Sequence, residues 1–211
     1  MSPRIKLATT TLAVSFLINA YFIFANYYAV SENGTNTHMW LSGLLVLPAI
    51  ACLLIAPLCL VIAVFKKYRA QSINGFIISA IFFASAFVCI RVGGLVRDHA
   101  FHQLAERSQP LVSALEAYQA QEGSLPPSLE ALVPKYLADV PNTQMGAYPE
   151  YEYYVGQEAM QYDSNPWVLV IQTPSGGINW DMFMYFPLQN YPQSGYGGSL
   201  ELIGKWAYVH E

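Results

Sequence analysis

The side chains best suited to binding a metal ion gather in one short segment, "RDHAFHQLAE", at residues 97–106. In a helix, Asp98, His102 and Glu106 follow one another at intervals of four residues and share one face. His99 lies three residues before His102. Imidazole nitrogens and carboxylate oxygens are ligands for zinc and other divalent cations. His99, His102 and Glu106 are therefore candidate metal ligands, and the same spacing also fits an ordinary pair between His102 and Glu106 on an exposed helix.

Motifs for other catalytic chemistry are missing from the sequence. There is no G-x-S-x-G motif, and Cys52, Cys59 and Cys89 all lie in apolar runs, so no activated nucleophile is indicated. The segment "GYGGSLELIG" is rich in glycine but lacks the lysine and the helical pattern of a phosphate-binding loop. We expect no enzymatic activity and no cofactor.

The charges divide the chain into two regions, residues 1–97 and residues 98–211. Seven of the ten lysines and arginines lie in the first region with one acid, Glu32, which leaves three basic and thirteen acidic residues in the second. A region with a net charge of about −10 repels phosphates, so we expect no nucleic-acid partner. Basic proteins or divalent cations are conceivable partners, and a simple solvated acidic surface is the alternative.

Three apolar runs predict transmembrane helices at about residues 7–28, 41–65 and 76–95. Each is long enough to cross a hydrocarbon core of about 30 Å as a helix. A cleavable signal peptide is the alternative for the first run, because basic residues precede it, but the two further runs favour a membrane anchor. The short basic segments, before residue 7 and at "FKKYRAQ", place the N-terminus in the cytoplasm and everything after the third span outside.

The helical pattern continues beyond the third span. Leucines at positions 104, 111 and 115 recur at helical spacing to about Glu122, and Gly123 is a typical helix terminator. Pro110 either kinks this helix or marks a restart, and the sequence does not separate these alternatives. Four segments rich in aromatic and β-branched residues then predict strands, at residues 150–155, 167–173, 179–186 and 205–210. "TPSGG", at residues 173–177, resembles a hairpin turn.

A cluster of tyrosines precedes and enters the first predicted strand. In "YPEYEYY", the rings of Tyr148, Tyr151, Tyr153 and Tyr154 cannot all point inward if the segment is extended. The sequence therefore predicts an exposed aromatic patch, formed by these four tyrosines and suited to contact with another protein.

The pattern G-x-x-P-x-S-L-x-x-L links the helix to the strands, and it is followed by "VPKYLADVP". A membrane helix that continues as an amphipathic helix, then this connector, then an antiparallel sheet, resembles the type IV pilins and the type II secretion pseudopilins of the major, G-type class. The resemblance covers residues 76–211. It implies an α+β pilin-like domain in which the long helix packs on the sheet, and it implies a bacterial cell, with this domain in the periplasm.

The chain also departs from the pilin pattern. Gly75-Phe76 is similar to a processing site, but Ala80 stands where pilins carry a glutamate, and two spans precede it. We therefore expect a permanently anchored domain rather than a processed, polymerising pilin. The candidates for the calcium loop of the pseudopilins do not reproduce that loop, so we predict no calcium ligands. These candidates are Asp163, Ser164, Asn165 and Asp181.

These observations together predict three transmembrane helices followed by an α+β pilin-like domain. The expected protein is a non-enzymatic component of the bacterial inner membrane that presents a periplasmic interaction domain to a protein partner, in a secretion or envelope assembly. The alternative is a membrane-resident immunity or inhibitor protein that neutralises a toxin at the periplasmic face.

Overall fold

The computed structural model describes residues 1–176 and 179–211. It divides into two compact units, the first formed by residues 1–28 and 37–97 and the second by residues 29–36 and 98–211. Helix α4 (Arg69–Arg107) contributes to both units. The short loop at residues 29–36 belongs to the second unit although helices of the first unit precede and follow it.

The first unit is helical. It consists of α1 (Pro3–Ala29), α2 (Thr37–Leu44), α3 (Val46–Ile62) and the first part of α4. Three stretches within the described residues are long and apolar enough to cross a membrane: Pro3–Ala29, Thr37–Ile62 and Arg69–Glu122. The first and third predicted spans lie within these stretches, and the second matches Thr37–Ile62 except for its last three residues. The structure thus confirms the coarse prediction of helices that are long and apolar enough to span a membrane.

The second stretch is interrupted between α2 and α3. Leu45 keeps helical dihedral angles, φ −73° and ψ −14°, and its N–H donates to the Ser42 carbonyl at 2.9 Å. Pro48 has no N–H, so the carbonyl of Leu44 loses the donor that would continue the helix. Pro57 lies inside α3. The interruption therefore follows from the missing N–H of Pro48.

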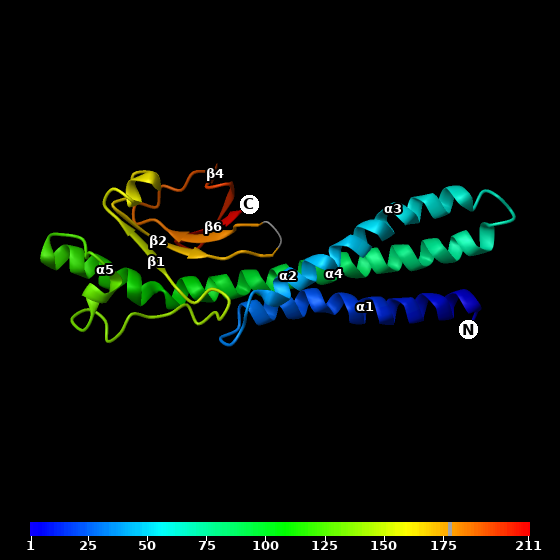
Figure 1. Cartoon of the computed structure of the whole chain (residues 1–211), viewed down its shortest axis with the longest axis horizontal. Coiled ribbons are helices and arrows are strands. Elements are labelled where there is room, and N and C mark those ends of the chain that lie inside the picture. The colour runs from blue at the N-terminus through cyan, green and yellow to red at the C-terminus, as the bar shows by residue number, and fades with distance from the viewer. Residues whose placement is uncertain (177–178) are drawn as a thin grey trace. The chain divides into compact units, whose positions relative to one another are not determined.

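Helices α1 and α4 approach closely within the first unit, as Figure 1 shows. The buried Asn19 amide donates to the Ser85 hydroxyl at 2.7 Å. At Gly93 a Cβ atom would lie 2.7 Å from the Asn26 side-chain nitrogen and 3.0 Å from the Phe22 carbonyl oxygen. Small residues and buried amide or hydroxyl groups are the usual means by which helices associate in a bilayer.

The helix of the second unit continues past Pro110. Ser108, between α4 and α5 (Gln109–Glu122), has helical angles of φ −80° and ψ −11°. Its N–H donates to the Leu104 carbonyl at 2.9 Å, and its own carbonyl accepts from Val112 at 3.2 Å. Pro110 therefore interrupts the hydrogen-bond ladder without turning the chain away from the helix. Gly123 ends α5 in the left-handed region, at φ +69°.

The connector after α5 is fastened to the end of that helix. It contains the 3₁₀ helix η1 (Leu129–Leu132), whose two leucines are buried. The Lys135 ammonium lies 2.6 Å from a Glu122 carboxylate oxygen, and the Tyr136 hydroxyl donates to the same oxygen at 2.9 Å. The proline- and leucine-rich segment thus packs against the last turns of the helix.

The second unit contains one six-stranded antiparallel sheet in the order β1-β2-β3-β6-β5-β4. Each of the four predicted strand segments contains one strand, whereas β4 and β5 were not predicted. The "TPSGG" segment follows β2, but its last residue, Gly177, lies outside the described residues. The strands are β1 (Glu152–Val155), β2 (Trp167–Gln172), β3 (Met182–Tyr185), β4 (Ser194–Gly195), β5 (Gly198–Ile203) and β6 (Trp206–His210).

One side of the sheet packs against the helix through aromatic rings. The Phe101 ring of α4 lies 5.1 Å from the Phe183 ring and 5.0 Å from the Tyr208 ring, centroid to centroid. Farther along the helix, Ser108 shares a hydrogen bond of 2.7 Å with the Tyr151 hydroxyl. Figure 1 shows the strands lying along the helix at this point. Such contacts bury large apolar areas, which is the main stabilising term for a fold without disulfides.

The other side of the sheet has its own apolar cluster. Val168, Val170, Met184, Phe186 and Val209 are fully buried there. Among the covering tyrosines, Tyr162 follows β1 and the 3₁₀ helix η2 (Ala159–Gln161), Tyr191 follows β3, and Tyr196 lies in the turn between β4 and β5. The sheet is therefore covered on both sides, by a helix on one and by irregular chain on the other.

The loop at residues 29–36 is bound by a later segment of the second unit. The Gly146 N–H donates to the Ser31 carbonyl at 2.8 Å. A Cβ atom at Gly146 would lie 2.4 Å from the Gly34 carbonyl oxygen and 2.7 Å from that of Glu32. Only glycine permits two backbones to approach this closely. The loop is thus an integral part of the sheet-containing unit.

Replacing Gly146 by alanine should destabilise the second unit by about 1–3 kcal/mol, because the new methyl group must displace the backbone of residues 32–34. Pulse proteolysis of the full chain in lipid nanodiscs would measure this change. Gly195→Ala is the matched control, since its Cβ would lie 3.5 Å from the Pro192 ring, an ordinary contact distance. Equal stability of the two variants would contradict the tight contact.

Candidate functional site

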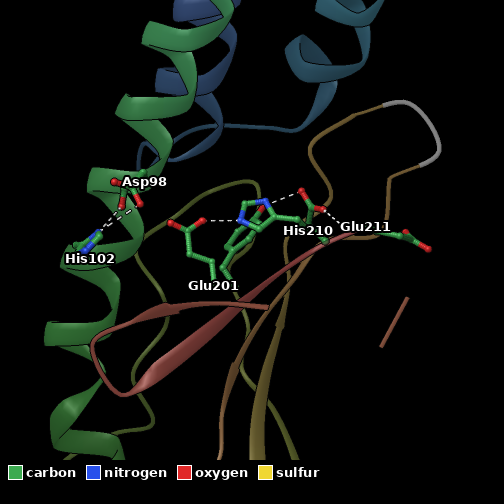
Figure 2. Close-up of polar contacts among 7 residues, drawn as sticks. Asp98, His102, Glu201, His210 and Glu211 are labelled. Atoms are coloured by element: carbon green, nitrogen blue, oxygen red, sulfur yellow. Dashed lines mark hydrogen bonds and ion pairs between the residues drawn. The ribbon is translucent and has the colours of Figure 1, made fainter. Parts of the chain in front are cut away.

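The three predicted metal ligands lie along one exposed stretch of α4 in the second unit. His102 turns back to its own helix: its Nδ1 lies 3.0 Å from the Asp98 carbonyl oxygen and 3.6 Å from the Asp98 carboxylate. His99 instead shares a hydrogen bond of 3.1 Å with the Gln103 side chain. Glu106 is exposed. Figure 2 shows the pairing of Asp98 with His102.

A second histidine–carboxylate pair lies on the sheet. His210 Nε2 lies 2.7 Å from a Glu201 carboxylate oxygen (Figure 2). The His210 ring lies 4.6 Å from the ring of Tyr208, centroid to centroid. Each pair is local and exposed, with only one carboxylate and one imidazole. Across residues 1–176 and 179–211, no three histidine, cysteine or acidic side chains are placed to hold a metal ion. The geometry therefore does not assemble His99, His102 and Glu106 into a metal site.

The four predicted interaction tyrosines do not form one exposed patch. Tyr148 is only 2 % exposed, and its hydroxyl donates to the Pro174 carbonyl at 2.9 Å. Tyr151 and Tyr153 are half-buried on the helix side, where Tyr153 donates to the Pro126 carbonyl at 3.2 Å. Tyr154 points to the opposite side of the sheet, since side chains alternate along a strand. The prediction is corrected accordingly: Tyr148 belongs to the core, and the three other rings are half-buried and divided between the two sides of the sheet.

The structure brings Tyr154 together with two tyrosines that the sequence does not place near it. Its ring lies 5.4 Å from that of Tyr162, which in turn stacks on Tyr196 at 5.5 Å and 22°. All three rings are half-buried. We call these rings, with the neighbouring carboxylates of Glu152 and Asp163, the tyrosine surface.

Carboxylates orient the outer two hydroxyls of the tyrosine surface. The Tyr154 hydroxyl donates to Glu152 at 2.9 Å, and the Gln172 amide donates to the same oxygen at 3.0 Å. The Tyr196 hydroxyl donates to Asp163. Burial, followed by the adjacent carboxylate, raises the pKa of both phenols well above the ordinary value of 10.0. Both hydroxyls therefore stay protonated and act as hydrogen-bond donors.

The segments that carry Tyr162 and Tyr196 are locked together by amide groups. Asn165 is fully buried; its amide nitrogen donates to Asn190 at 2.8 Å and its oxygen accepts from the Leu188 N–H at 3.1 Å. Asp163 and Ser164 both occupy the left-handed region, at φ 49° and 61°. Non-glycine residues in this region are uncommon, and surrounding contacts must hold them there.

Asp181, the fourth residue compared with the pseudopilin calcium loop, lies elsewhere in the second unit. It is buried, and its carboxylate accepts from the Tyr208 hydroxyl at 2.7 Å and from the Glu211 N–H at 3.0 Å. Its contacts are thus those of a structural carboxylate at the ends of β3 and β6.

A shallow open pocket lies between the connector and β1. Its volume is about 210 Å³, below the range of about 300–1,000 Å³ typical of small-molecule sites. The two tyrosine hydroxyls in its lining already bond within the unit, to Ser108 and Pro126. The tyrosine surface is therefore the better candidate. The pocket is lined by Pro127, Ser128, Leu129, Glu130, Tyr151 and Tyr153.

No protein-family model, curated protein or solved structure matches the chain.

The raised pKa of Tyr154 and Tyr196 predicts a loss of stability in alkaline solution. The folded unit favours the neutral phenols. Their contribution to the free energy of unfolding is therefore fully present below pH 10.0 and is lost as the pH rises towards their folded-state pKa. Tyrosinate absorbance and tryptophan fluorescence, followed together above about pH 9, should show these phenols ionising only as the sheet unfolds. The variant Tyr154→Phe/Tyr196→Phe should lose less stability over that interval. Ionisation of both at about pH 10 in an intact sheet would contradict the prediction.

Proposed function

We propose that the protein is a non-enzymatic membrane protein that presents a pilin-like α+β domain to a protein partner. The observation that carries this proposal is the tyrosine surface: stacked, half-exposed rings flanked by carboxylates on a unit continuous with a membrane-spanning helix. Tyrosine is enriched in protein interfaces because it offers a large, stiff contact area with a polar end.

The pilin-like character of this domain rests on the connector and on the order of its elements. A long helix, a short buried turn with Leu129 and Leu132, and then an antiparallel sheet are the features expected of that fold. We accordingly assign the protein to a secretion or envelope assembly.

The basic residues around the spans support a location in the bacterial inner membrane, with the N-terminus in the cytoplasm and the second unit in the periplasm. Arg4 and Lys6 precede the apolar run at residues 7–28, and Lys66, Lys67 and Arg69 lie between the runs at residues 41–65 and 76–95. Lysine and arginine near the ends of spans stay on the cytoplasmic side.

Cysteine labelling tests this topology. In a full-length protein whose three native cysteines are replaced by alanine, Ser199→Cys should react with a membrane-impermeant maleimide added to spheroplasts, because Ser199 is exposed on the second unit. Gln71→Cys, exposed near the start of α4, is the matched control and should react only after the membrane is opened. The reverse pattern would overturn the orientation.

Crosslinking in living cells tests the function itself. The whole protein should capture a specific partner that a version truncated after Arg97 loses, provided that both versions reach the membrane in equal amounts. A component of a secretion or envelope assembly would support the proposal. A toxin would instead establish the immunity function, and the absence of any partner that depends on residues 98–211 would refute both.

A further inference from the structure

Within the described residues, the carboxylates of the tyrosine surface accept their hydrogen bonds from neutral donors. Glu152 is held by Tyr154 and Gln172, and Asp163 by Tyr196. Neither acid takes part in an ion pair of the kind that joins His102 to Asp98, Lys135 to Glu122 and His210 to Glu201 among residues 1–176 and 179–211. Two negative charges therefore remain on this surface without a cation in the described part of the chain.

The second unit can offer few cations of its own. Its three basic residues are Arg107, Lys135 and Lys205. Arg107 donates to the Thr143 carbonyl at 2.8 Å, and Lys135 pairs with Glu122 at 2.6 Å. With a net charge of about −10 for residues 98–211, the unit attracts cationic partners over distances longer than any single contact.

The rings add a second type of attraction for the same partners. Arginine and lysine side chains bind over aromatic rings, and a guanidinium group can also form paired hydrogen bonds with a carboxylate. On the tyrosine surface the hydroxyls of Tyr154 and Tyr196 are already fixed by hydrogen bonds, so these rings lose little freedom when a partner binds.

Exposed apolar side chains lie in the same covering segments. Met160 is 54 % exposed two residues before Tyr162, and Leu188 is 57 % exposed on the segment joined to Asn165. Apolar contacts of this kind suit a polypeptide better than a bare metal ion or polyamine, since only a polypeptide presents apolar side chains between its charges.

We propose that the tyrosine surface docks a basic segment of a protein partner. Lysine or arginine side chains of that segment pair with Glu152 and Asp163 and lie against the three tyrosine rings, while its apolar residues contact Met160 and Leu188. This inference rests on the proposed function, because it specifies the chemistry of the partner that the domain binds.

A fluorescein-labelled peptide, Arg-Leu-Arg-Gly-Arg-Leu-Arg, is the probe. Its binding to the full chain in nanodiscs of zwitterionic lipid is measured by fluorescence anisotropy at about 0.15 M salt, where screening limits long-range attraction. Saturable binding is expected, and a peptide with glutamate in place of each arginine should not bind. No saturable binding of the basic peptide would refute the proposal.

The variant Glu152→Gln/Asp163→Asn tests the carboxylates and should weaken binding at least about tenfold, because two charge-assisted contacts become neutral. Glutamine still accepts the hydrogen bond from Tyr154, and asparagine tolerates the left-handed backbone at position 163. Glu106→Gln/Glu116→Gln removes the same charge from exposed positions on the long helix and is the matched control. Equal weakening by both variants would mean that binding depends on the net charge of the unit and not on Glu152 and Asp163, and it would overturn the proposal.

Photocrosslinking in the otherwise unchanged chain avoids any effect of these substitutions on folding. With p-benzoylphenylalanine in place of Gln161, which is exposed beside Tyr162, the basic peptide should become attached to the protein. The same residue in place of Gln103, exposed on α4, should give no attachment. Attachment at Gln103 but not at Gln161 would place the peptide away from the tyrosine surface.

The two proposals fail in different ways. If the peptide does not bind but the whole protein still captures a partner that the truncated version loses, the docking chemistry is wrong and the proposed function stands. If the peptide binds as expected but cells yield no such partner, the surface recognises basic segments while the assignment to an assembly is wrong.

Discussion

Helix α4 has to suit hydrocarbon along its first part and water along its last part. The rest of the structure depends on this change of surroundings within one helix. Up to about residue 95 it is apolar enough to lie in hydrocarbon. From Asp98 onwards it alternates between residues that pack on the sheet, such as Phe101 and Leu104, and polar residues such as His102 and Gln103 that face water. The change takes less than two turns, and it fixes which face of the helix the sheet covers.

The sheet meets this helix with aromatic rings and is then left with a second apolar side. Strand alternation makes this unavoidable, because Val168 and Val170 point away from the helix when Trp167 and Leu169 point towards it. A six-stranded sheet in water must bury such a face. The chain does so with two irregular segments joined through Asn165 and with the turn between β4 and β5. In covering the core, the segment after β1 and this turn also bring Tyr162 and Tyr196 beside Tyr154. The candidate interaction surface is thus a by-product of the need to close the outer side of the sheet.

Sequence patterns anticipate the parts of this fold that depend on local chemistry. The apolar runs, the terminator at Gly123 and four aromatic strand segments are all visible because each depends on residues close together in the chain. Strands β4 and β5 were not predicted because "GYGGSLELIG" is rich in glycine, which is not typical of strands. These strands form through pairing with each other and with β6, which a local sequence pattern does not reveal. The predicted tyrosine patch is wrong for a similar reason. Counting rings in one segment gives no information on the partners of Tyr148 and Tyr151, which come from distant parts of the chain.

The loop at residues 29–36 has a consequence for the order in which the protein can mature. Its contact from Asn36 to Tyr148 joins positions 112 residues apart. The ribosome therefore completes this loop long before it makes the segment around Gly146 that receives it. During that interval the loop has no binding site, and α1 and α2 are joined by a length of chain that has not yet acquired its final conformation. Contacts between residues far apart in the chain form slowly, so the second unit must complete its folding late, after the segment around Gly146 has been synthesised.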